Sequence, residues 1–282
     1  MKALYHLNQK MRKIIVERQL LTFHYKLMER ISPVMAKVPK DKEKAVIFSF
    51  DVETFTNARV NEHKVKEEYE VFMPRLLEVL DSYNIKAQFF VCGKAMELYS
   101  ESIYPIVQKN HNLGGHGYMH EKMTSLSEYT QKEIINKVKA IAKNFFDVDI
   151  ISWRSPYLAS NFGTYKALSE SGLKLSSSTL EVSWPVCIKG IIEVPLVAMD
   201  GDILGYFVNG FDVRDWIDFM KKSLVKLDKG ILVFGMHTWF QMRYDSKLTG
   251  LQEFLSWIEP FREEVWIGSL DEYYQKYVFS SD

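Results

Sequence analysis

From Ala45 onward, short apolar segments alternate with longer amphipathic ones, and this alternation restricts the fold more than any other feature. The short segments have the length and residue types of buried strands, and the longer ones have helical spacing of apolar residues. Strands are expected at 45–50, 86–92, 112–115, 150–153, 173–178, 191–198, 231–236 and 265–270, and helices at 67–83, 95–109, 127–146, 163–171, 213–227, 251–258 and the C-terminus. The pattern predicts an α/β fold whose seven or eight parallel strands close into a (β/α) barrel with helices outside.

Residues 1–44 precede this pattern and are expected to form a basic helical extension and a linker. An apolar seam with a 3–4 repeat predicts a helix over residues 3–32, and Ser32-Pro33 ends it. Residues 1–40 have a net charge of +7, although the whole chain has a formal net charge of +0. The helix could dock on the main domain, mediate self-association or lie on an anionic membrane surface. The barrel domain is expected at residues 45–282.

Composition limits the classes of function. A hydrophobic content of 47% supplies a sizeable core, and the zero net charge gives no reason to expect a nucleic-acid partner. Cys92 and Cys187 lie far apart without metal-type spacing, and Cys92 is expected in the core. Charged residues interrupt the N-terminal apolar positions, and no apolar run is long enough to span a bilayer. A soluble, cytoplasmic protein is expected.

Polar clusters follow five of the expected strands. In parallel barrels the loops after the strands hold the chemistry, so these clusters are expected to converge. They are Asp51/Glu53, His116/His120, Arg154–Tyr157, the loop 176–184 and His237.

Two histidines and a carboxylate in this set suggest a metal site. His116 and His120 have the i,i+4 spacing common among metal ligands, and the glycines around them allow the backbone to bend. With one carboxylate they make three protein ligands, which leaves positions open for water and substrate, as catalytic sites require. The same ligand set also occurs in non-haem iron oxygenases.

The remaining polar residues supply groups for hydrolysis. The Arg154 guanidinium can orient a carboxylate, Pro156 can direct the Tyr157 N–H toward a developing oxyanion, and His237 is a candidate acid. Neither Arg154 nor His237 is required for oxygen activation, which disfavours the oxygenase.

These motifs, in this order, resemble those of the polysaccharide deacetylase family, the metal-dependent carbohydrate esterases with the chitooligosaccharide deacetylase homology domain. The motifs are Asp51-Val-Glu53, His116-x-x-x-His120, Arg154-x-Pro156-Tyr157 and His237, and the likeness covers roughly residues 45–275. The resemblance implies a distorted (β/α) barrel. It also implies Asp51 as the general base, Glu53, His116 and His120 as metal ligands, Arg154 as the residue that orients the base, Tyr157 as an oxyanion donor and His237 as the general acid.

The sequence departs from the family pattern at two places. Val52 separates two acids that are adjacent in many members, and the loop that usually supplies an Asp beside the catalytic histidine keeps Trp184 but has only Glu181. Asp200 and Asp202 are possible substitutes for that Asp. Among aromatic residues near the motifs, we expect Tyr118, Trp184 and Trp239 to contact a sugar ring.

The expected activity is metal-dependent removal of an acetyl or formyl group from an aminosugar, with Zn²⁺ as the first choice of ion and Co²⁺, Ni²⁺, Mn²⁺ or Fe²⁺ as alternatives. The lack of an export signal favours a cytoplasmic nucleotide-linked or lipid-linked precursor, with peripheral contact to the inner membrane face or self-association through residues 1–40. A catalytically inactive sugar-binding barrel, and an amidase of the same family with a non-sugar substrate, are the alternatives.

Overall fold

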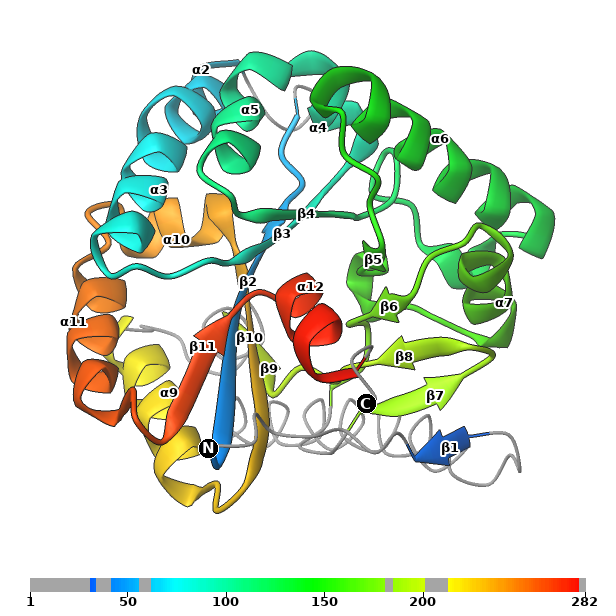
Figure 1. The fold of residues 1–282 in the computed structure, drawn as a ribbon. Helices are drawn as coiled ribbons and strands as arrows, with labels where there is room; N and C mark the ends of the chain where they lie inside the picture. Colours follow the sequence, from blue (N-terminus) through cyan, green and yellow to red (C-terminus); the bar gives the residue numbers. More distant parts are fainter. Residues whose placement is uncertain (1–30, 34–41, 56–61, 181–184, 201–212, 279–282) are drawn as a thin grey trace, which may run out of the picture.

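Strands form the centre of the molecule and helices cover its outside (Figure 1). The computed structural model describes residues 31–33, 42–55, 62–180, 185–200 and 213–278. The strands are β1 (Ile31–Pro33), β2 (Lys44–Val52), β3 (Gln88–Val91), β4 (Asn112–Gly115), β5 (Ser152–Trp153), β6 (Leu175–Ser176), β7 (Val186–Ile188), β8 (Ile191–Glu193), β9 (Ala198–Met199), β10 (Gly230–His237) and β11 (Val265–Gly268).

Most of the helices lie between successive strands, as the alternation predicts, and several are short or irregular. The α-helices are α2 (Glu62–Lys66), α3 (Met73–Ser82), α4 (Gly93–Leu98), α5 (Ser100–Gln108), α6 (Glu128–Phe146), α7 (Phe162–Glu170), α9 (Val213–Lys226), α10 (Thr238–Tyr244), α11 (Thr249–Ile258) and α12 (Leu270–Tyr273). The π-helical segments are η1 (Glu67–Phe72) and η5 (Tyr274–Val278), and the 3₁₀ turns are η2 (Met123–Ser125), η3 (Pro156–Leu158) and η4 (Glu259–Phe261).

The sheet is parallel around most of its circumference, with β2 as its best-paired strand. The order is β1-β7-β8-β6-β5-β4-β3-β2-β10-β9, and β11 pairs with β2. One edge of β2 pairs with β10, and its other edge pairs with β11 at its beginning and with β3 at its end. After β8 the chain crosses from one end of the sheet to the other, since Leu196 N–H donates to Thr179 O and Val197 N–H donates to Val233 O. The predicted (β/α)-barrel type of fold is therefore confirmed, in the form of a curled mixed sheet in which β7 is antiparallel to both of its neighbours.

Local details differ from the predictions where a residue interrupts the regular pattern. The single strand expected at 191–198 is two strands, β8 and β9, because Pro195 lies between them and has no N–H to donate. The antiparallel strands β1 and β7 were not expected. Residues 31–33 form β1 instead of the end of a helix, and the rest of the helix expected at 3–32 lies outside the described residues.

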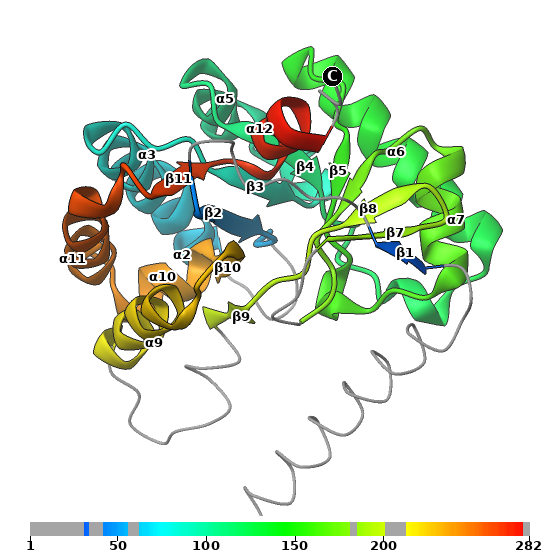
Figure 2. The same cartoon turned by 60° about the horizontal axis from the view of Figure 1, so that its bottom comes forward.

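The last α-helix covers the N-terminal ends of the strands. Leu270 and Tyr273 of α12 are fully buried. The hydroxyl of Ser269 donates to Asn112 Oδ1, and the Asp271 N–H donates to Gln88 Oε1, at the first residues of β4 and β3. Figures 1 and 2 show α12 against the middle of the ring of strands. The opposite, C-terminal ends of the strands are thus the ends available for a site.

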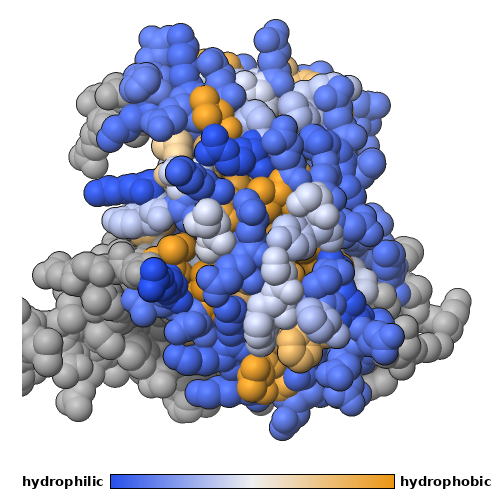
Figure 3. Space-filling view, turned by 90° about the vertical axis from the view of Figure 1, so that its left-hand side faces the viewer, coloured by the Kyte–Doolittle hydropathy of each residue, from blue (hydrophilic) through white to orange (hydrophobic). Residues whose placement is uncertain are grey.

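The outer helices turn their apolar sides inward. In α3, α9 and α11 the buried residues recur at helical spacing, as in the set Leu76, Leu77 and Leu80 of α3. The surface over these helices is mostly hydrophilic, with small separate hydrophobic spots (Figure 3). Within the part of the chain that the structure describes, no helix has the length and apolar character needed to cross a membrane.

Candidate active site

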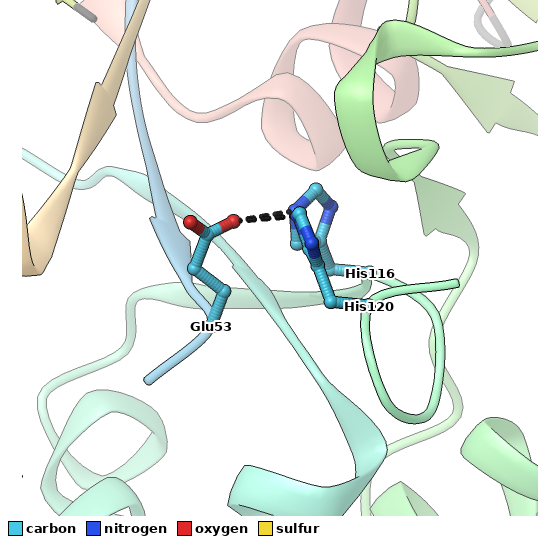
Figure 4. Close-up of side chains that lie close together, drawn as sticks. All are labelled: Glu53, His116 and His120. Carbon is cyan, nitrogen blue, oxygen red and sulfur yellow. Dashed lines mark hydrogen bonds and ion pairs between the residues drawn. The ribbon is translucent and has the colours of Figure 1, made fainter. Parts of the chain in front are cut away.

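A carboxylate and two imidazoles converge at the C-terminal ends of β2 and β4. Glu53 Oε2 lies 3.3 Å from His116 Nε2 and 2.8 Å from His120 Nε2. Their candidate ligand atoms all lie within 4.8 Å of one another, and Figure 4 shows the carboxylate directed at both rings. One carboxylate and two histidines are the donor set of catalytic metal sites that keep a position open for water.

The tautomer of His116 suits a metal ligand. Its Nδ1 lies 2.8 Å from the carbonyl oxygen of Arg154. A carbonyl oxygen only accepts, so Nδ1 carries a proton, and in the neutral ring Nε2 then has a lone pair free to bind a metal ion. A backbone carbonyl that fixes the tautomer of a ligand histidine is common at metal sites. The residues present therefore fit a divalent ion.

The loop between the two histidines has an unusual backbone conformation that places both rings on one side. Gly117 has φ +72° and His120 has φ +61°, in the left-handed region that non-glycine residues rarely adopt. The Glu121 carboxylate accepts hydrogen bonds from the N–H groups of Tyr118 and Met119, each at 2.9 Å. The side chain of Glu121 thus stabilises the bend that brings His120 back toward His116.

The second oxygen of the Glu53 carboxylate is also held in place. Trp239 Nε1–H donates to Glu53 Oε1 at 2.9 Å, which leaves Oε2 directed at the histidines. Burial raises the pKa of Glu53, but the charge of His237 and the contacts with His116 and His120 outweigh it and hold this pKa well below its usual value. Glu53 is therefore an anionic ligand candidate.

Asp51 and Arg154 form a buried ion pair next to this triad. Arg154 Nη1 donates to Asp51 Oδ1 at 2.7 Å, and both side chains are almost completely buried. The other guanidinium nitrogens donate to Ser49 and Ser177, so the fork is fixed on several sides. Asp51 Oδ2 lies 3.8 Å from His116 Nε2. One oxygen of Asp51 is thus held by Arg154 and the other faces the site.

His237 comes to the same place through strand pairing and has a buried acid as its partner. In the parallel pair of β10 and β2, His237 is in register with Asp51. His237 Nδ1 lies 2.6 Å from Asp200 Oδ1, and the His237 N–H donates to Asp200 Oδ2 at 2.9 Å. Burial lowers the pKa of His237, but Asp200 and Glu53 outweigh it and raise this pKa to about 10. His237 is consequently an imidazolium that can donate a proton.

Asp200 resolves the departure in the motif loop. Sequence reasoning named Asp200 and Asp202 only as substitutes without a motif, and Asp202 and Glu181 lie outside the described residues. Asp200 follows β9, which pairs in parallel with β10 so that Met199 is in register with Gly235. This register places Asp200 next to His237 although 37 residues separate them in the chain. An acid directly after an apolar strand was the only signal in the sequence.

Tyr157 offers a backbone donor at the rim of the site. Its φ of +60° is in the left-handed region, and its ring contacts the His120 ring at a centroid distance of 4.5 Å. Within the described residues, the Tyr157 N–H donates to no other group, whereas the next N–H, of Leu158, donates to Ser155 O. A strained residue with an unused N–H beside a candidate metal site is suited to bind an oxyanion.

The aromatic residues expected to contact a sugar have different surroundings. Trp239 donates to Glu53, so part of its role is to orient a ligand. The hydroxyl of Tyr118 donates to Glu97, and Lys137 Nζ lies 3.2 Å from the centroid of its ring. Trp184 lies outside the described residues. Sugar contact by all three stays a prediction.

The comparisons with known proteins agree with this fold and site. The family model for polysaccharide deacetylase matches residues 39–176, just under half of the chain, so the resemblance to that family is confirmed. A peptidoglycan deacetylase from Helicobacter pylori is 24% identical over 148 residues, 52% of this chain and 47% of its own length. A bifunctional xylanase/deacetylase from Pseudobutyrivibrio xylanivorans is 28% identical over 46% of this chain and 22% of its own. This chain thus spans about half or less of the length of these curated relatives.

Solved structures show the same fold over most of the chain. A protein assigned as a polysaccharide deacetylase from Mycobacterium smegmatis has a TM-score of 0.75 at 24% identity, covering 86% of this chain and 93% of that one. An allantoinase has a TM-score of 0.74 at 16% identity, with coverage of 86% and 93%. At these identities the likeness establishes the fold alone.

Proposed function

We propose that the protein hydrolyses the N-acyl group, acetyl or formyl, of an aminosugar in a metal-dependent reaction. The observation that supports this best is the ligand triad of Glu53, His116 and His120 next to a carboxylate held by an arginine, Asp51, and near a charged imidazole, His237. Hydrolysis of an amide needs a base for water, a site for the oxyanion and an acid for the departing nitrogen. The match to the polysaccharide deacetylase family model supports a carbohydrate as substrate.

The triad would hold the ion through His116 Nε2, His120 Nε2 and Glu53 Oε2. Zn²⁺ is the ion that we propose, because nitrogen and carboxylate donors in a three-ligand site suit it. A bound divalent ion supplies polarisation of the amide carbonyl and a lower pKa for water in the site.

The residues around the triad divide the proton transfers between them. Asp51 accepts the proton of the attacking water at Oδ2, while Arg154 holds Oδ1 and keeps the carboxylate oriented. The Tyr157 N–H donates to the carbonyl oxygen as negative charge develops on it. His237 holds a proton at Nε2, since Asp200 fixes Nδ1, and transfers it to the departing amine nitrogen.

We further propose that the substrate is a nucleotide-linked or lipid-linked precursor in the cytoplasm. The basic residues 1–40 support contact with the inner membrane face or self-association, because their net charge of +7 complements anionic lipid headgroups. This segment lies almost entirely outside the described residues, so the support comes from its sequence.

The test is release of acid from a panel of soluble N-acetyl and N-formyl aminosugars, with free sugars, chitooligosaccharides and nucleotide-linked sugars in parallel. We expect acetate or formate from at least one class, loss of activity with a chelator and recovery with Zn²⁺. Elemental analysis of the purified protein identifies the ion. Hydrolysis of cyclic amides alone would instead indicate an amidase, and binding of sugars without release of acid would indicate an inactive barrel.

A further inference from the structure

A buried acid near the site, Glu68, has no part in the reaction described above. Glu68 belongs to η1 and is fully buried together with its neighbours Tyr69 and Phe72. Acids are seldom buried in this way without a partner or a role. Glu68 lies on the face of η1 that packs inward, where the helical spacing of the sequence leads one to expect an apolar residue.

Glu68 is the first member of a hydrogen-bond chain that ends at the backbone of the candidate base. Glu68 Oε1 lies 2.5 Å from Thr238 Oγ1, and Thr238 Oγ1 lies 3.2 Å from the carbonyl oxygen of Asp51. Thr238 directly follows His237 in the chain. The chain of contacts therefore joins the strand end that holds the acid to the strand end that holds the base.

The Thr238 hydroxyl lies within hydrogen-bond distance of two oxygens, Glu68 Oε1 and the Asp51 carbonyl oxygen, and can donate to only one of them at a time. The Asp51 carbonyl oxygen can only accept, and the Thr238 hydroxyl has a single hydrogen. When that hydrogen is given to Asp51 O, the short contact between Thr238 Oγ1 and Glu68 Oε1 needs a hydrogen on Glu68. Glu68 is then a neutral carboxylic acid that donates to Thr238.

The surroundings of Glu68 agree with a neutral side chain. Its second oxygen, Oε2, has no hydrogen-bond partner among the described residues, which would be costly for a buried anion. Burial raises the pKa of Glu68 to about 7, the charge of Glu53 acts in the same direction, and contacts with the hydroxyls of Thr238 and Thr54 limit the rise.

The same turn also holds the end of β2. The Tyr69 hydroxyl donates to the carbonyl oxygen of Thr54 at 2.7 Å, one residue beyond Glu53. Two consecutive side chains of one π-helical turn thus contact both strand ends of the site. π-Helical turns occur frequently at functional sites.

We propose that Glu68 is a positioning residue for deacylation, which as a neutral donor to Thr238 fixes His237 relative to Asp51. The inference rests on the proposed function for its catalytic readout. Because a misplacement of about 1 Å can reduce turnover on the order of 10²-fold, a donor that fixes this spacing should affect kcat more than KM.

The first experiment compares Glu68→Leu, which cannot donate, with Glu68→Gln, whose amide can. Glu70→Leu is the matched control, since Glu70 lies on the same turn and is exposed. On N,N′-diacetylchitobiose or the best substrate of the panel, we expect Glu68→Leu to lower kcat about 10- to 100-fold with KM and zinc content unchanged. Glu68→Gln should restore most of the turnover, and Glu70→Leu should match the parent.

The second experiment removes the partner, and it also serves if Glu68→Leu fails to fold. Thr238→Val should reproduce the loss in kcat, Thr238→Ser should retain turnover, and the double variant Glu68→Leu/Thr238→Val should lose no more than either single variant. Equal losses in Glu68→Gln and Glu68→Leu, or additive losses in the double variant, would overturn the proposal.

A third measurement tests the positioning role of Glu68 separately from the proposed deacylation activity. If the parent releases acid from no substrate, the proposed function fails, and the positioning role is read from amide hydrogen exchange in residues 233–240. Exchange there should be faster in Glu68→Leu and Thr238→Val than in the parent and in Glu68→Gln. Equal exchange in all variants at equal global stability would refute the positioning role independently of activity.

Discussion

The two acids at the end of β2 differ in their partners although only Val52 separates them. Asp51 is paired with the Arg154 guanidinium, and Glu53 faces two imidazoles and the Trp239 indole. Their positions in the sequence do not distinguish them, because residues two apart on a strand point to the same face of the sheet. Their surroundings give them different chemistry, as for other pairs of carboxylates in one site.

Replacing Asp51 or Glu53 by its amide should therefore impair the protein in different ways. Asp51→Asn retains the shape and removes the proton acceptor, so zinc content should stay near that of the parent while turnover falls about 10²–10⁴-fold. Glu53→Gln replaces the anionic ligand, so zinc should be lost on dialysis and excess zinc should restore part of the activity. Metal titration of both variants, with the parent dialysed in parallel, decides between the roles. Loss of metal from Asp51→Asn alone would reverse them.

His237 should depend on Asp200 for its proton. Asp200 raises the pKa of His237, which reaches about 10, so the protonated acid persists throughout the neutral range and is lost as pH rises through that value. Asp200→Asn removes a raising influence, so the alkaline limb of kcat/KM should move to lower pH and turnover at pH 9 should fall most. The pH profile of parent and variant between pH 6 and 11 measures this. An unshifted alkaline limb would show that another group sets it.

At the scale of elements, the loop 116–121 should be stabilised by Glu121. Its carboxylate accepts two backbone N–H groups, so Glu121→Ala should loosen the bend at His120 and weaken zinc binding about 10- to 100-fold, as for other groups that orient ligands. Glu133→Ala on the exposed face of α6 is the control. Competition with a chromophoric chelator gives the affinities. An unchanged affinity would mean that the glycines alone shape the loop.

Sequence reasoning identified the elements that have a clear period. Strands β2, β3 and β10 and helix α6 lie close to the expected ranges, because long apolar runs and amphipathic spacing are strong signals. Strands β1 and β7, with three residues each, are too short to show a period. The pairing of Asp200 with His237 depends on the register of β9 against β10, which is a tertiary property that no local pattern encodes.

At the scale of the whole molecule, the free energy of unfolding should depend on pH through Asp271, a buried acid of α12. Burial raises the pKa of Asp271 to about 7, whereas an unfolded Asp has a pKa near ~3.9, so the folded state retains a proton that the unfolded state releases. The contribution to stability is complete below the unfolded value and declines as pH rises to about 7, by about 1.4 kcal/mol per pH unit at most. Glu68 acts in the same direction.

Urea unfolding at pH 5 and pH 8 measures this effect. We expect the parent to be less stable at pH 8, and Asp271→Asn to show a smaller difference between the two pH values. Asp228→Asn, at an exposed position, is the control and should behave like the parent. Equal differences in parent and Asp271→Asn would show that Asp271 is not neutral in the folded protein.

Removal of the basic extension should leave chemistry intact but alter association. All candidate site residues follow residue 44, so chains beginning at Ile31 or at Asp41 should both retain turnover on a small soluble substrate. Only the shorter chain lacks β1, which pairs with β7 and covers its edge. An uncovered edge strand pairs readily with another chain, so light scattering should detect more self-association in the chain that begins at Asp41. Loss of turnover in a folded truncate would contradict this.

The position of helix α12 has a consequence for how substrate enters and products leave. Leu270 and Tyr273 of α12 are buried at the N-terminal ends of the strands, so in the proposed reaction water, substrate and both products would enter and leave at the C-terminal ends. In the proposed reaction the departing carboxylate is an anion, and the ion held by the triad and the His237 imidazolium would both attract it. We expect its departure to limit the rate at which the next substrate binds, so product release should set the turnover rate as much as the two proton transfers do.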